Sequence, residues 1–331
     1  MLWTEKYRPA ALEEIIGQEP VIGRLVSFAG SGTVPHLMLT GPHGTGKSVA
    51  IECFAKKLYG ENWMNNTSVF QTADLFLQGK KILEEDERYA HIYQKNASLI
   101  VNFKYILKWY ASMRPLDAPF KLMVFEDAHT LPREAQQGLR RIMERYSGTC
   151  RFIFSTTNQS AIIPAITSRC LPLPFVPLPA DIIIGHLNAI RAKEPEAEFP
   201  CTDDDIELIA QASQGDLRNA LLLLQVALQS GQCKNIHGIA RSETATVATS
   251  GIQSIKNGDV RLAIRQLEML MIDYGLSGRE VLSEIRRAAR REYNDPRLAI
   301  AIADADSRIG HSNNEYLQID AFAAGIQEVF S

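Results

Sequence analysis

The sequence predicts an α/β domain with a parallel sheet, followed by a back half that is all-α. Short apolar runs of strand length stand at His36–Thr40, Lys121–Phe125 and Arg151–Ser155. Helical patterns separate these runs, for example at Val49–Tyr59 and Glu134–Tyr146. Strands that alternate with helices are typical of a parallel sheet whose two faces are both covered.

A proline-rich stretch marks the end of this domain. Leu171–Ala180 holds four prolines in ten residues. Because proline blocks helix continuation and lacks a backbone donor, we expect an extended segment that leaves the sheet. Beyond it the pattern is helical: Gly215 and Asp216 can cap a helix over Leu217–Gln229, which Gly231 then ends.

Another helix begins further along, where Ser277 and Glu280 form a capping-box pattern. The apolar residues after this box share one helical face, and arginines share the other. They are Val281, Leu282, Ile285, Ala288 and Ala289 on the first face and Arg286, Arg287, Arg290 and Arg291 on the second. We therefore predict three domains: the α/β domain at 1–175, a small helical domain at 176–238 and a larger helical domain at 239–331.

The composition is that of an ordinary soluble protein. The 331 residues are 46% hydrophobic and 22% charged, and chains of this length form about two or three domains. No apolar run approaches the roughly 18 residues that a membrane span needs, and the first residues lack the apolar stretch of a signal peptide. The five cysteines are an odd number without a CxxC pair, which argues against a disulfide framework and a structural zinc site. We expect a cytoplasmic protein that does not enter a membrane.

Charge is unevenly divided along the chain. Residues 1–175 carry 20 Lys and Arg against 16 Asp and Glu, whereas residues 176–331 carry 15 against 22. An imbalance this small is typical of a solvated surface, so it does not by itself indicate a nucleic-acid partner.

A phosphate-binding motif lies between the first predicted strand and the helix after it. Residues 41–48 read GPHGTGKS, which matches G-x-x-x-x-G-K-[S/T]. Glycines allow backbone N–H groups to face phosphate oxygens, Lys47 brings a charge to the β- and γ-phosphates, and Ser48 offers a hydroxyl to Mg²⁺. The helix that follows points its positive end at the same anion. The predicted loop comprises Gly41, Pro42, His43, Gly44, Thr45, Gly46, Lys47, Ser48 and Val49.

Two carboxylates follow the second apolar run. Leu122–Phe125 leads directly into Glu126 and Asp127, at the point where a buried strand meets the surface. Solvated acids at a strand end are the simpler interpretation. With a phosphate loop upstream in an α/β domain, we favour a site that holds the metal and activates water.

Further motifs stand in a fixed order along the chain. They are Trp3–Pro9 followed by Ile16-Gly17-Gln18, the phosphate loop, Asn158, Thr167-Ser168-Arg169-Cys170, Gly215-Asp216-Leu217-Arg218 and Asn314–Gln318. In this order they resemble the clamp-loader small subunits of replication factor C, which are AAA+ ATPases. The chain is most similar to the second small-subunit type of some archaea.

The resemblance implies an architecture and a set of partners. It implies a RecA-like (AAA+) ATPase domain at 1–175, a helical lid at 176–238 and an oligomerising α-helical collar at 239–331. It also implies a subunit that uses ATP, ADP and Mg²⁺ within a hetero-oligomeric ring of five subunits. Such a ring loads a sliding clamp onto primer–template DNA for replication, and the archaeal likeness implies a cytoplasmic, nucleoid-associated location.

The resemblance also assigns roles to residues. Tyr7, Arg8, Ile16 and Gly17 correspond to the segment beside the adenine. Asn158 and Arg218 correspond to the two sensors of the subunit's own nucleotide. Arg169 corresponds to an arginine finger, which acts in trans on the nucleotide of a neighbouring subunit. With Lys47, Glu126 and Asp127 it completes the predicted catalytic set.

One departure bears on hydrolysis. The family reads Asp-Glu-Ala-Asp where this chain reads Glu126-Asp127-Ala128-His129. The resemblance still implies that Glu126 reaches Mg²⁺ through a water and that Asp127 stands in the position of the base that acts on the attacking water. Asp127 is one methylene shorter than the usual base, and a misplacement of about 1 Å can lower a rate roughly 100-fold. A subunit that binds ATP and donates its finger but hydrolyses weakly is therefore the alternative function, and whether this chain is itself an active ATPase stays open at the level of sequence.

A second departure is the longer region between the loop and the acidic strand. Gln71-Thr72-Ala73-Asp74 replaces Asn-Ala-Ser-Asp, and the segment at about 75–117 contains aromatics that we assign to helix core rather than to base stacking. These are Phe103, Tyr105, Trp109 and Tyr110.

The helix after the acidic strand is the predicted DNA contact. It carries Arg133, Arg140, Arg141 and Arg145, and arginines on a helix can follow a duplex through its phosphates without reading its sequence. We assign DNA contact to Arg140 and Arg141, with salt bridges between subunits as the alternative. A small-molecule phosphotransferase would need neither the Ser-Arg-Cys motif nor a helical back third, so these features argue against one.

Overall fold

The computed structural model describes residues 1–115, 117–194, 200–230, 243–292, 296–310, 312 and 314–327. The chain divides into two compact units, residues 1–231 and 232–331. The predicted boundary at 238/239 lies outside the described residues, as do Cys233 and the side chains of Arg290 and Arg291. Each unit has its own hydrophobic core.

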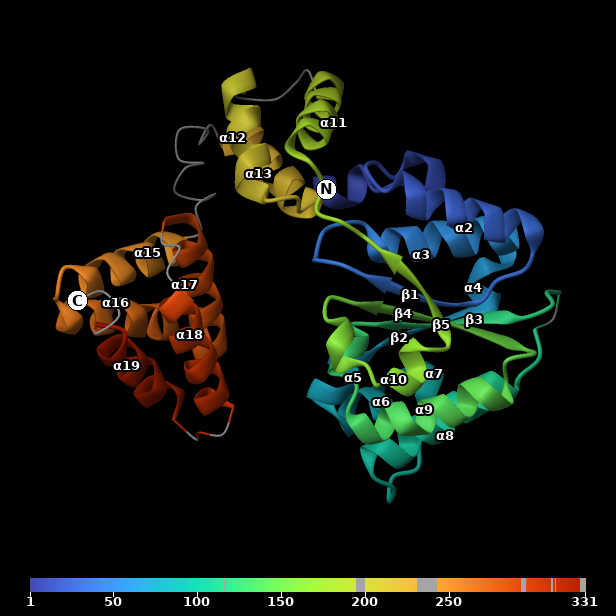
Figure 1. Ribbon diagram of the computed structural model, residues 1–331. Helices are drawn as coiled ribbons and strands as arrows, with labels where there is room; N and C mark the ends of the chain where they lie inside the picture. Colours follow the sequence, from blue (N-terminus) through green and yellow to red (C-terminus); the bar gives the residue numbers. More distant parts are fainter. Residues whose placement is uncertain are drawn as a thin grey trace. The chain divides into compact units, whose positions relative to one another are not determined.

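A sheet of five parallel strands forms the centre of the first unit (Figure 1). The strand order is β2-β3-β4-β1-β5. The strands are β1 (His36–Thr40), β2 (Thr67–Gln71), β3 (Lys121–Glu126), β4 (Cys150–Thr156) and β5 (Cys170–Pro174). The three strands that the sequence predicts are confirmed to within one residue at each end, whereas β2 and β5 have no clear apolar run.

Alternate residues of the strands face opposite sides of the sheet, as the period of two of a β-strand requires. On β1, Leu37 and Leu39 pack with α2 (Glu19–Ser31) and α3 (Lys47–Tyr59), and Met38 packs in the cluster on the other side. That second cluster includes α8 (Leu99–Ser112) and α9 (Arg133–Arg145). Helices therefore cover both faces, which confirms the predicted parallel α/β architecture.

The proline-rich stretch differs from its prediction. Its first half does not leave the sheet, because Cys170–Pro174 pairs with β1 as β5, with Pro172 opposite Met38. An edge strand tolerates proline, since on one side it has no neighbour to receive a backbone donor. The chain leaves the sheet only after Pro174.

The remaining helices of the first unit are short before β5 and longer after it, in the predicted lid. They are α1 (Trp3–Lys6), α4 (Trp63–Asn66), α5 (Thr72–Gln78), α6 (Lys80–Glu85), α7 (Glu87–Ala90), α10 (Pro164–Thr167), α11 (Ala180–Lys193), α12 (Asp203–Ser213) and α13 (Leu217–Ser230). The predicted cap of α13 is confirmed, because the Asp216 carboxylate accepts a hydrogen bond from the backbone N–H of Asn219 at 2.9 Å.

The long region after β2 folds onto the sheet. Phe103 is fully buried, and Trp109 and Tyr110 pack against the same core. Three of the four predicted core aromatics are therefore confirmed, whereas Tyr105 is 44% exposed on the outer side of α8.

The described residues of the second unit are all-α, as predicted. Its helices are α15 (Glu243–Lys256), α16 (Val260–Ile272), α17 (Gly278–Glu292), α18 (Pro296–Ile309) and α19 (Glu315–Gly325). The capping box is confirmed, since Glu280 accepts from the backbone N–H and hydroxyl of Ser277 at 2.8 Å. The predicted apolar face of α17 is buried. Among the described helices of both units, none is long and apolar enough to cross a membrane.

Candidate nucleotide-binding site

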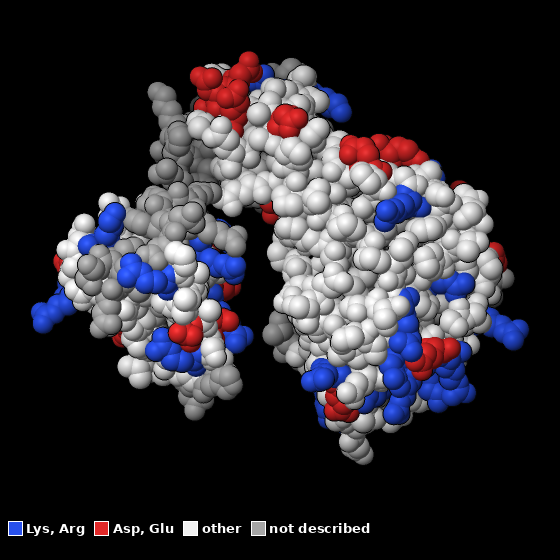
Figure 2. All heavy atoms as spheres, viewed as in Figure 1, with Lys and Arg blue, Asp and Glu red and all other residues white. Residues whose placement is uncertain are grey.

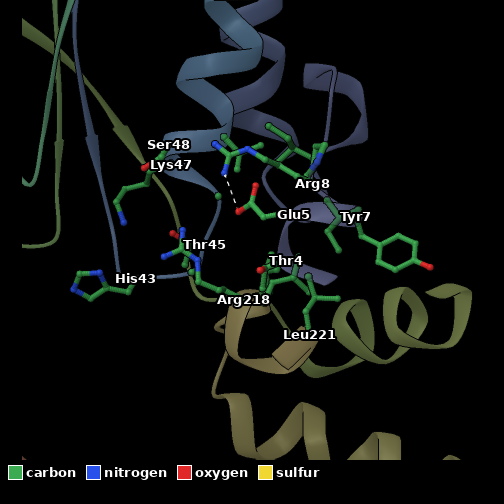
Figure 3. Close-up of a pocket in the computed structure, with 18 of the residues that line it drawn as sticks. Thr4, Glu5, Tyr7, Arg8, His43, Thr45, Lys47, Ser48, Arg218 and Leu221 are labelled. Atoms are coloured by element: carbon green, nitrogen blue, oxygen red, sulfur yellow. Dashed lines mark ion pairs between the residues drawn. The ribbon is translucent and has the colours of Figure 1, made fainter. Parts of the chain in front are cut away.

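A cavity of about 330 Å³ opens where β1 ends and α3 begins (Figure 3). The N-terminal segment, the phosphate loop, residues of β2, β3 and β4, and the chain from Leu178 into the predicted lid line it. Most of the predicted site residues meet there. They are Tyr7, Arg8, Ile16, His43, Gly44, Thr45, Gly46, Lys47, Ser48, Val49, Glu126, Asp127 and Arg218.

Two positions of the phosphate loop require glycine, because the backbone there lies too close to neighbouring groups to carry a Cβ. Gly41 has a φ of +148°, and a Cβ there would lie 2.1 Å from the carbonyl oxygen of Phe175. Gly44 has a φ of +67°, and a Cβ there would lie 1.7 Å from the carboxylate of Asp216. A side chain at either position would force the linker or the lid away from the loop.

Lys47 is buried beneath this loop. Its Nζ donates to the carbonyl oxygens of Gly41 at 2.8 Å and Pro42 at 2.6 Å, so these two residues act through their backbone although they do not line the cavity. Burial lowers the pKa of Lys47, and the nearby carboxylates of Glu126 and Asp127 oppose that shift. The lysine is thus a buried cation whose hydrogen-bond partners are neutral carbonyl groups, which suits it to an anionic ligand.

Glu126 and Ser48 meet beside Lys47 in the lining of the cavity. The Ser48 hydroxyl donates to Glu126 Oε2 at 3.0 Å. Burial raises the pKa of Glu126, and hydrogen bonds from Ser155 and Ser48 act in the other direction. A hydroxyl and a carboxylate are the hard oxygen ligands that Mg²⁺ prefers, so these residues fit that ion.

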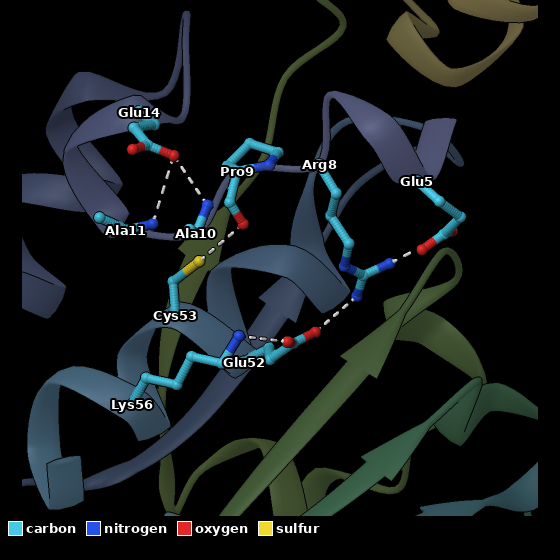
Figure 4. Close-up of polar contacts among 9 residues, drawn as sticks. All are labelled: Glu5, Arg8, Pro9, Ala10, Ala11, Glu14, Glu52, Cys53 and Lys56. Carbon is cyan, nitrogen blue, oxygen red and sulfur yellow. Dashed lines mark hydrogen bonds and ion pairs between the residues drawn. The ribbon is translucent and has the colours of Figure 1, made fainter. Parts of the chain in front are cut away.

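The N-terminal segment is tied to the helix that carries Lys47 (Figure 4). Arg8 Nη2 donates to Glu52 Oε2 at 2.7 Å, and Glu52 also pairs with Lys56 at 2.7 Å. The Cys53 thiol donates to the carbonyl of Pro9 at 3.4 Å. These contacts hold Arg8 at the edge of the cavity.

The same segment also touches the lid. The backbone N–H of Trp3 donates to Gln225 of α13 at 2.9 Å, and Lys6 and Tyr7 both donate to Glu194, just after α11. The N-terminal residues therefore join the phosphate-loop helix to the lid. The lid itself reaches the loop, since the backbone N–H of Leu217 donates to the carbonyl of Gly44 at 3.2 Å.

Besides Gly41 and Pro42, two further predicted cofactor residues lie away from the cavity lining. Asn158 caps a short helix after β4 and accepts from the backbone N–H of Ser160 at 3.1 Å. Gly17 lies against the linker, where a Cβ would be 2.4 Å from Leu178 Cδ2. Their predicted roles stay predictions.

Sequence reasoning missed several residues of the lining, which include Thr4, Glu5, Gln71, Ser155, Leu178, His186 and Leu221. Glu5 stands 3.9 Å from Arg8 and so faces the cavity with it. Thr4, Glu5 and Gln71 belong to motifs that the sequence singled out. His186 and Leu221 stand on lid helices without a distinguishing pattern, so only the fold brings them here.

Arg169 lies outside this cavity. Its Nη2 donates to Glu144 Oε1 at 2.6 Å and its Nη1 to the carbonyl of Ala165 at 2.7 Å, and the side chain is 38% exposed. Glu144 belongs to α9 and also stands 4.0 Å from Arg140 Nε. The buried amide of Gln136, on the same helix, accepts from the backbone N–H of Ile163 at 2.8 Å. Helix α9 thus holds both the backbone before Arg169 and its guanidinium.

Solved structures define the class. A point mutant of Thermotoga maritima RuvB aligns with a TM-score of 0.55 at 15% identity, over 89% of this chain and 91% of that chain. The Aeropyrum pernix Orc1 protein in complex with DNA aligns with a TM-score of 0.54 at 17% identity, over 89% of this chain and 84% of that chain. With the phosphate loop between β1 and α3, these likenesses define the AAA+ fold.

Sequence comparisons name the family. The replication factor C small subunit of Picrophilus torridus is 33% identical over 100% of this chain and 98% of its own length. That of Archaeoglobus fulgidus is 33% identical over 98% and 96%. Two family models also match: "DNA polymerase III, delta subunit" at residues 17–179 and "Replication factor C C-terminal domain" at residues 246–325. The chain belongs to the replication factor C small-subunit family, which confirms the predicted resemblance. The narrower likeness to the second archaeal type stays a prediction.

Replacing Glu126 with Gln should stabilise the ligand-free chain at high pH. Because the folded state raises the pKa of Glu126, its contribution to stability is fully present below the unfolded pKa and is lost as pH rises through the folded pKa. We expect E126Q to raise the melting temperature above that of the parent chain at pH 8, by more than at pH 5. Thermal unfolding at the two pH values measures this difference. E207Q, on an exposed face of α12, is the control and should change neither value; a melting temperature of E126Q below the parent at pH 8 would contradict the argument.

Proposed function

We propose that this chain is an ATP-binding subunit of a clamp loader, which uses ATP binding and hydrolysis to place a sliding clamp on primer–template DNA. The observation that carries the proposal is the separation of two cationic groups. Lys47 is buried in the cavity of this chain, whereas Arg169 stands outside it with its guanidinium partly exposed. An arginine so placed does not reach this chain's own cavity, which supports an action on a nucleotide held by another subunit.

In this proposal the cavity holds ATP. Lys47 and the backbone N–H groups of residues 43–48 bind the β- and γ-phosphates, and Tyr7, Arg8 and Ile16 lie beside the base. Mg²⁺ held near Ser48 and Glu126 would neutralise charge on the phosphates. Arg218 of the lid would contact the γ-phosphate, so that lid position depends on the nucleotide.

The remaining partners follow from the family. We propose that residues 1–175, 176–238 and 239–331 act as ATPase domain, lid and collar. The collar would join the chain to other clamp-loader subunits in a hetero-oligomer of five. Co-expression with candidate subunits followed by native mass spectrometry tests this assembly.

Removing the finger should stop hydrolysis at a neighbouring site. We expect R169A in the assembled complex to lower turnover at the site it faces by about 10³-fold or more, because an arginine finger contributes roughly that much. Single-turnover hydrolysis by the complex measures the effect, and equilibrium ATP binding by the R169A chain alone should be unchanged. R24A, on the exposed side of α2, is the matched control. Unchanged turnover, or a loss of this chain's own ATP affinity, would contradict the proposal.

A basic hollow supports DNA contact by α9. Lys104 and Lys108 of α8 and Arg141 and Arg145 of α9 line a hollow of about 580 Å³, with Glu134 as the acidic residue of its lining. Figure 2 shows blue Lys and Arg side chains gathered over the region of α8 and α9. Lys104 pairs with Glu134 at 2.8 Å, and the other three cations of the hollow suit a phosphate backbone. Arg140 differs, since it faces Glu144.

Neutralising the two arginines should flatten the salt dependence of DNA binding by the complex. Each lost phosphate contact lowers the slope of log K against log salt by about 0.9. We expect R141Q to lower it by about 0.9 and R140Q with R141Q by up to about 1.8. Binding to primer–template DNA at several salt concentrations gives the slope. R286Q with R287Q, on the exposed face of α17, should leave it unchanged, and an unchanged slope in R141Q would count against DNA contact here.

The second candidate function is the same subunit with weak hydrolysis of its own, and the order Glu126-Asp127 favours it. If Asp127 is a poor base, D127A should lower single-turnover hydrolysis at this chain's site by less than about tenfold, compared with the roughly 100-fold or greater loss typical of an effective base. The assembled complex with only this site intact is the sample to measure. A hundredfold loss would show that Asp127 is an effective base and would remove this candidate.

A further inference from the structure

A buried hydroxyl lies behind the two carboxylates of the cavity. Thr72, the first residue of α5, is fully buried. Its Oγ1 lies 2.6 Å from the carbonyl oxygen of Glu126, 2.8 Å from that of Asp127 and 2.9 Å from Thr130 Oγ1. Thr130 in turn donates to the Asp127 carbonyl at 2.9 Å, from its hydroxyl and from its backbone N–H. The two threonine hydroxyls therefore converge on two successive peptide groups.

The backbone that they hold is strained. Asp127 has φ 49° and ψ 42°, the left-handed region, and among the described residues it shares a positive φ outside glycine only with Gln214. Such a conformation costs free energy for a residue with a side chain and persists where the surroundings fix it. The hydrogen bonds to the carbonyl oxygen of Asp127 can stabilise this conformation in the turn after β3.

The sheet places Thr72 at this turn. Strand β2 pairs with β3 so that Gln71 lies opposite Glu126, and Thr72 is the next residue along the chain.

We propose that Thr72 is a positioning residue for Glu126 and Asp127. Its one hydroxyl proton, shared between the carbonyl oxygens of Glu126 and Asp127, holds this turn of the backbone, and so sets the direction in which Glu126 reaches Ser48 and Asp127 faces the cavity. The loop around Lys47 does not depend on this contact, since the carbonyls that hold Lys47 belong to Gly41 and Pro42. Thr72 therefore acts on the metal and on hydrolysis and leaves phosphate binding by the loop intact. This inference rests on the proposed function.

The test compares T72V, which removes the hydroxyl and keeps the shape, with T72S, which keeps the hydroxyl. ATP binding by the whole chain is measured in EDTA and in Mg²⁺, and single-turnover hydrolysis is measured in the assembled complex. We expect T72V to keep the metal-free affinity within about twofold, to lose most of the gain that Mg²⁺ gives the parent, and to hydrolyse up to about 100-fold more slowly, as a misplaced group does. T72S should restore both properties.

A control of the same kind stands on β2. The hydroxyl oxygen of Thr67 is buried and has no hydrogen-bond partner among the described residues, so T67V should change neither measurement. If T72V does not fold, T130V replaces it, because that change removes the second hydroxyl from the Asp127 carbonyl; it should lower the same two properties to a smaller extent.

Three results would overturn the role of Thr72. The first is that T72V and T72S have the same ATP affinities and hydrolysis rates, and the second is that Mg²⁺ increases the ATP affinity of T72V or T130V as much as it does in the parent. The third is that T72V loses as much ATP affinity in EDTA as in Mg²⁺, which would show a general collapse of the cavity. Failure of the proposed function looks different, because then the parent chain itself binds no ATP under either condition.

Discussion

The burial of one ammonium group, that of Lys47, is the constraint on which the first unit depends. A cation beneath a loop needs oxygen atoms around it, and the carbonyls of Gly41 and Pro42 accept its hydrogen bonds, while the negative charges of Glu126 and Asp127 nearby favour its charged form. Strands β1 and β3 are parallel, so the residues that follow them emerge at the same edge of the sheet. The fold therefore brings the phosphate loop next to the acidic pair, about 80 positions further along the chain, and the cavity forms between these two segments.

Much of this could be predicted from the sequence. The phosphate loop and the acidic pair are short motifs whose chemistry depends on residue type and spacing, so their meeting at one site follows once the sheet is predicted. The apolar runs of β1, β3 and β4 are visible because both faces of these strands are buried. The capped helices α13 and α17 begin where Asp216 and Ser277 predict, because caps are local interactions.

Other features depend on contacts between distant residues and leave no local pattern. Strand β5 contains prolines that argue against a strand in general, and only its place at the edge of the sheet allows them. His186 and Leu221 line the cavity through the way the lid folds, and Asn158 is turned away from the lining to cap a helix. Glu144 is an ordinary acidic residue of an amphipathic helix until the fold places it beside Arg169.

Helix α9 presents different groups on different sides. Glu144 and Gln136 hold Arg169 and the chain before it, whereas Arg141 and Arg145 face α8 across the basic hollow. Both sets are rigidly spaced because they share one helix. If both proposals for this helix are correct, the guanidinium offered to a neighbour and the cations offered to a nucleic acid keep a constant separation.

The contact between the N-terminal segment and the lid has a consequence for biosynthesis. Trp3 and its partner Gln225 are 222 positions apart in the chain. Most of the first unit therefore has to leave the ribosome before Trp3 can contact Gln225. Trp3, which is 5% exposed in the folded chain, is exposed to solvent until then. Pairing over so long a separation slows folding, so we expect the contact between Trp3 and Gln225 to form late in the folding of the first unit.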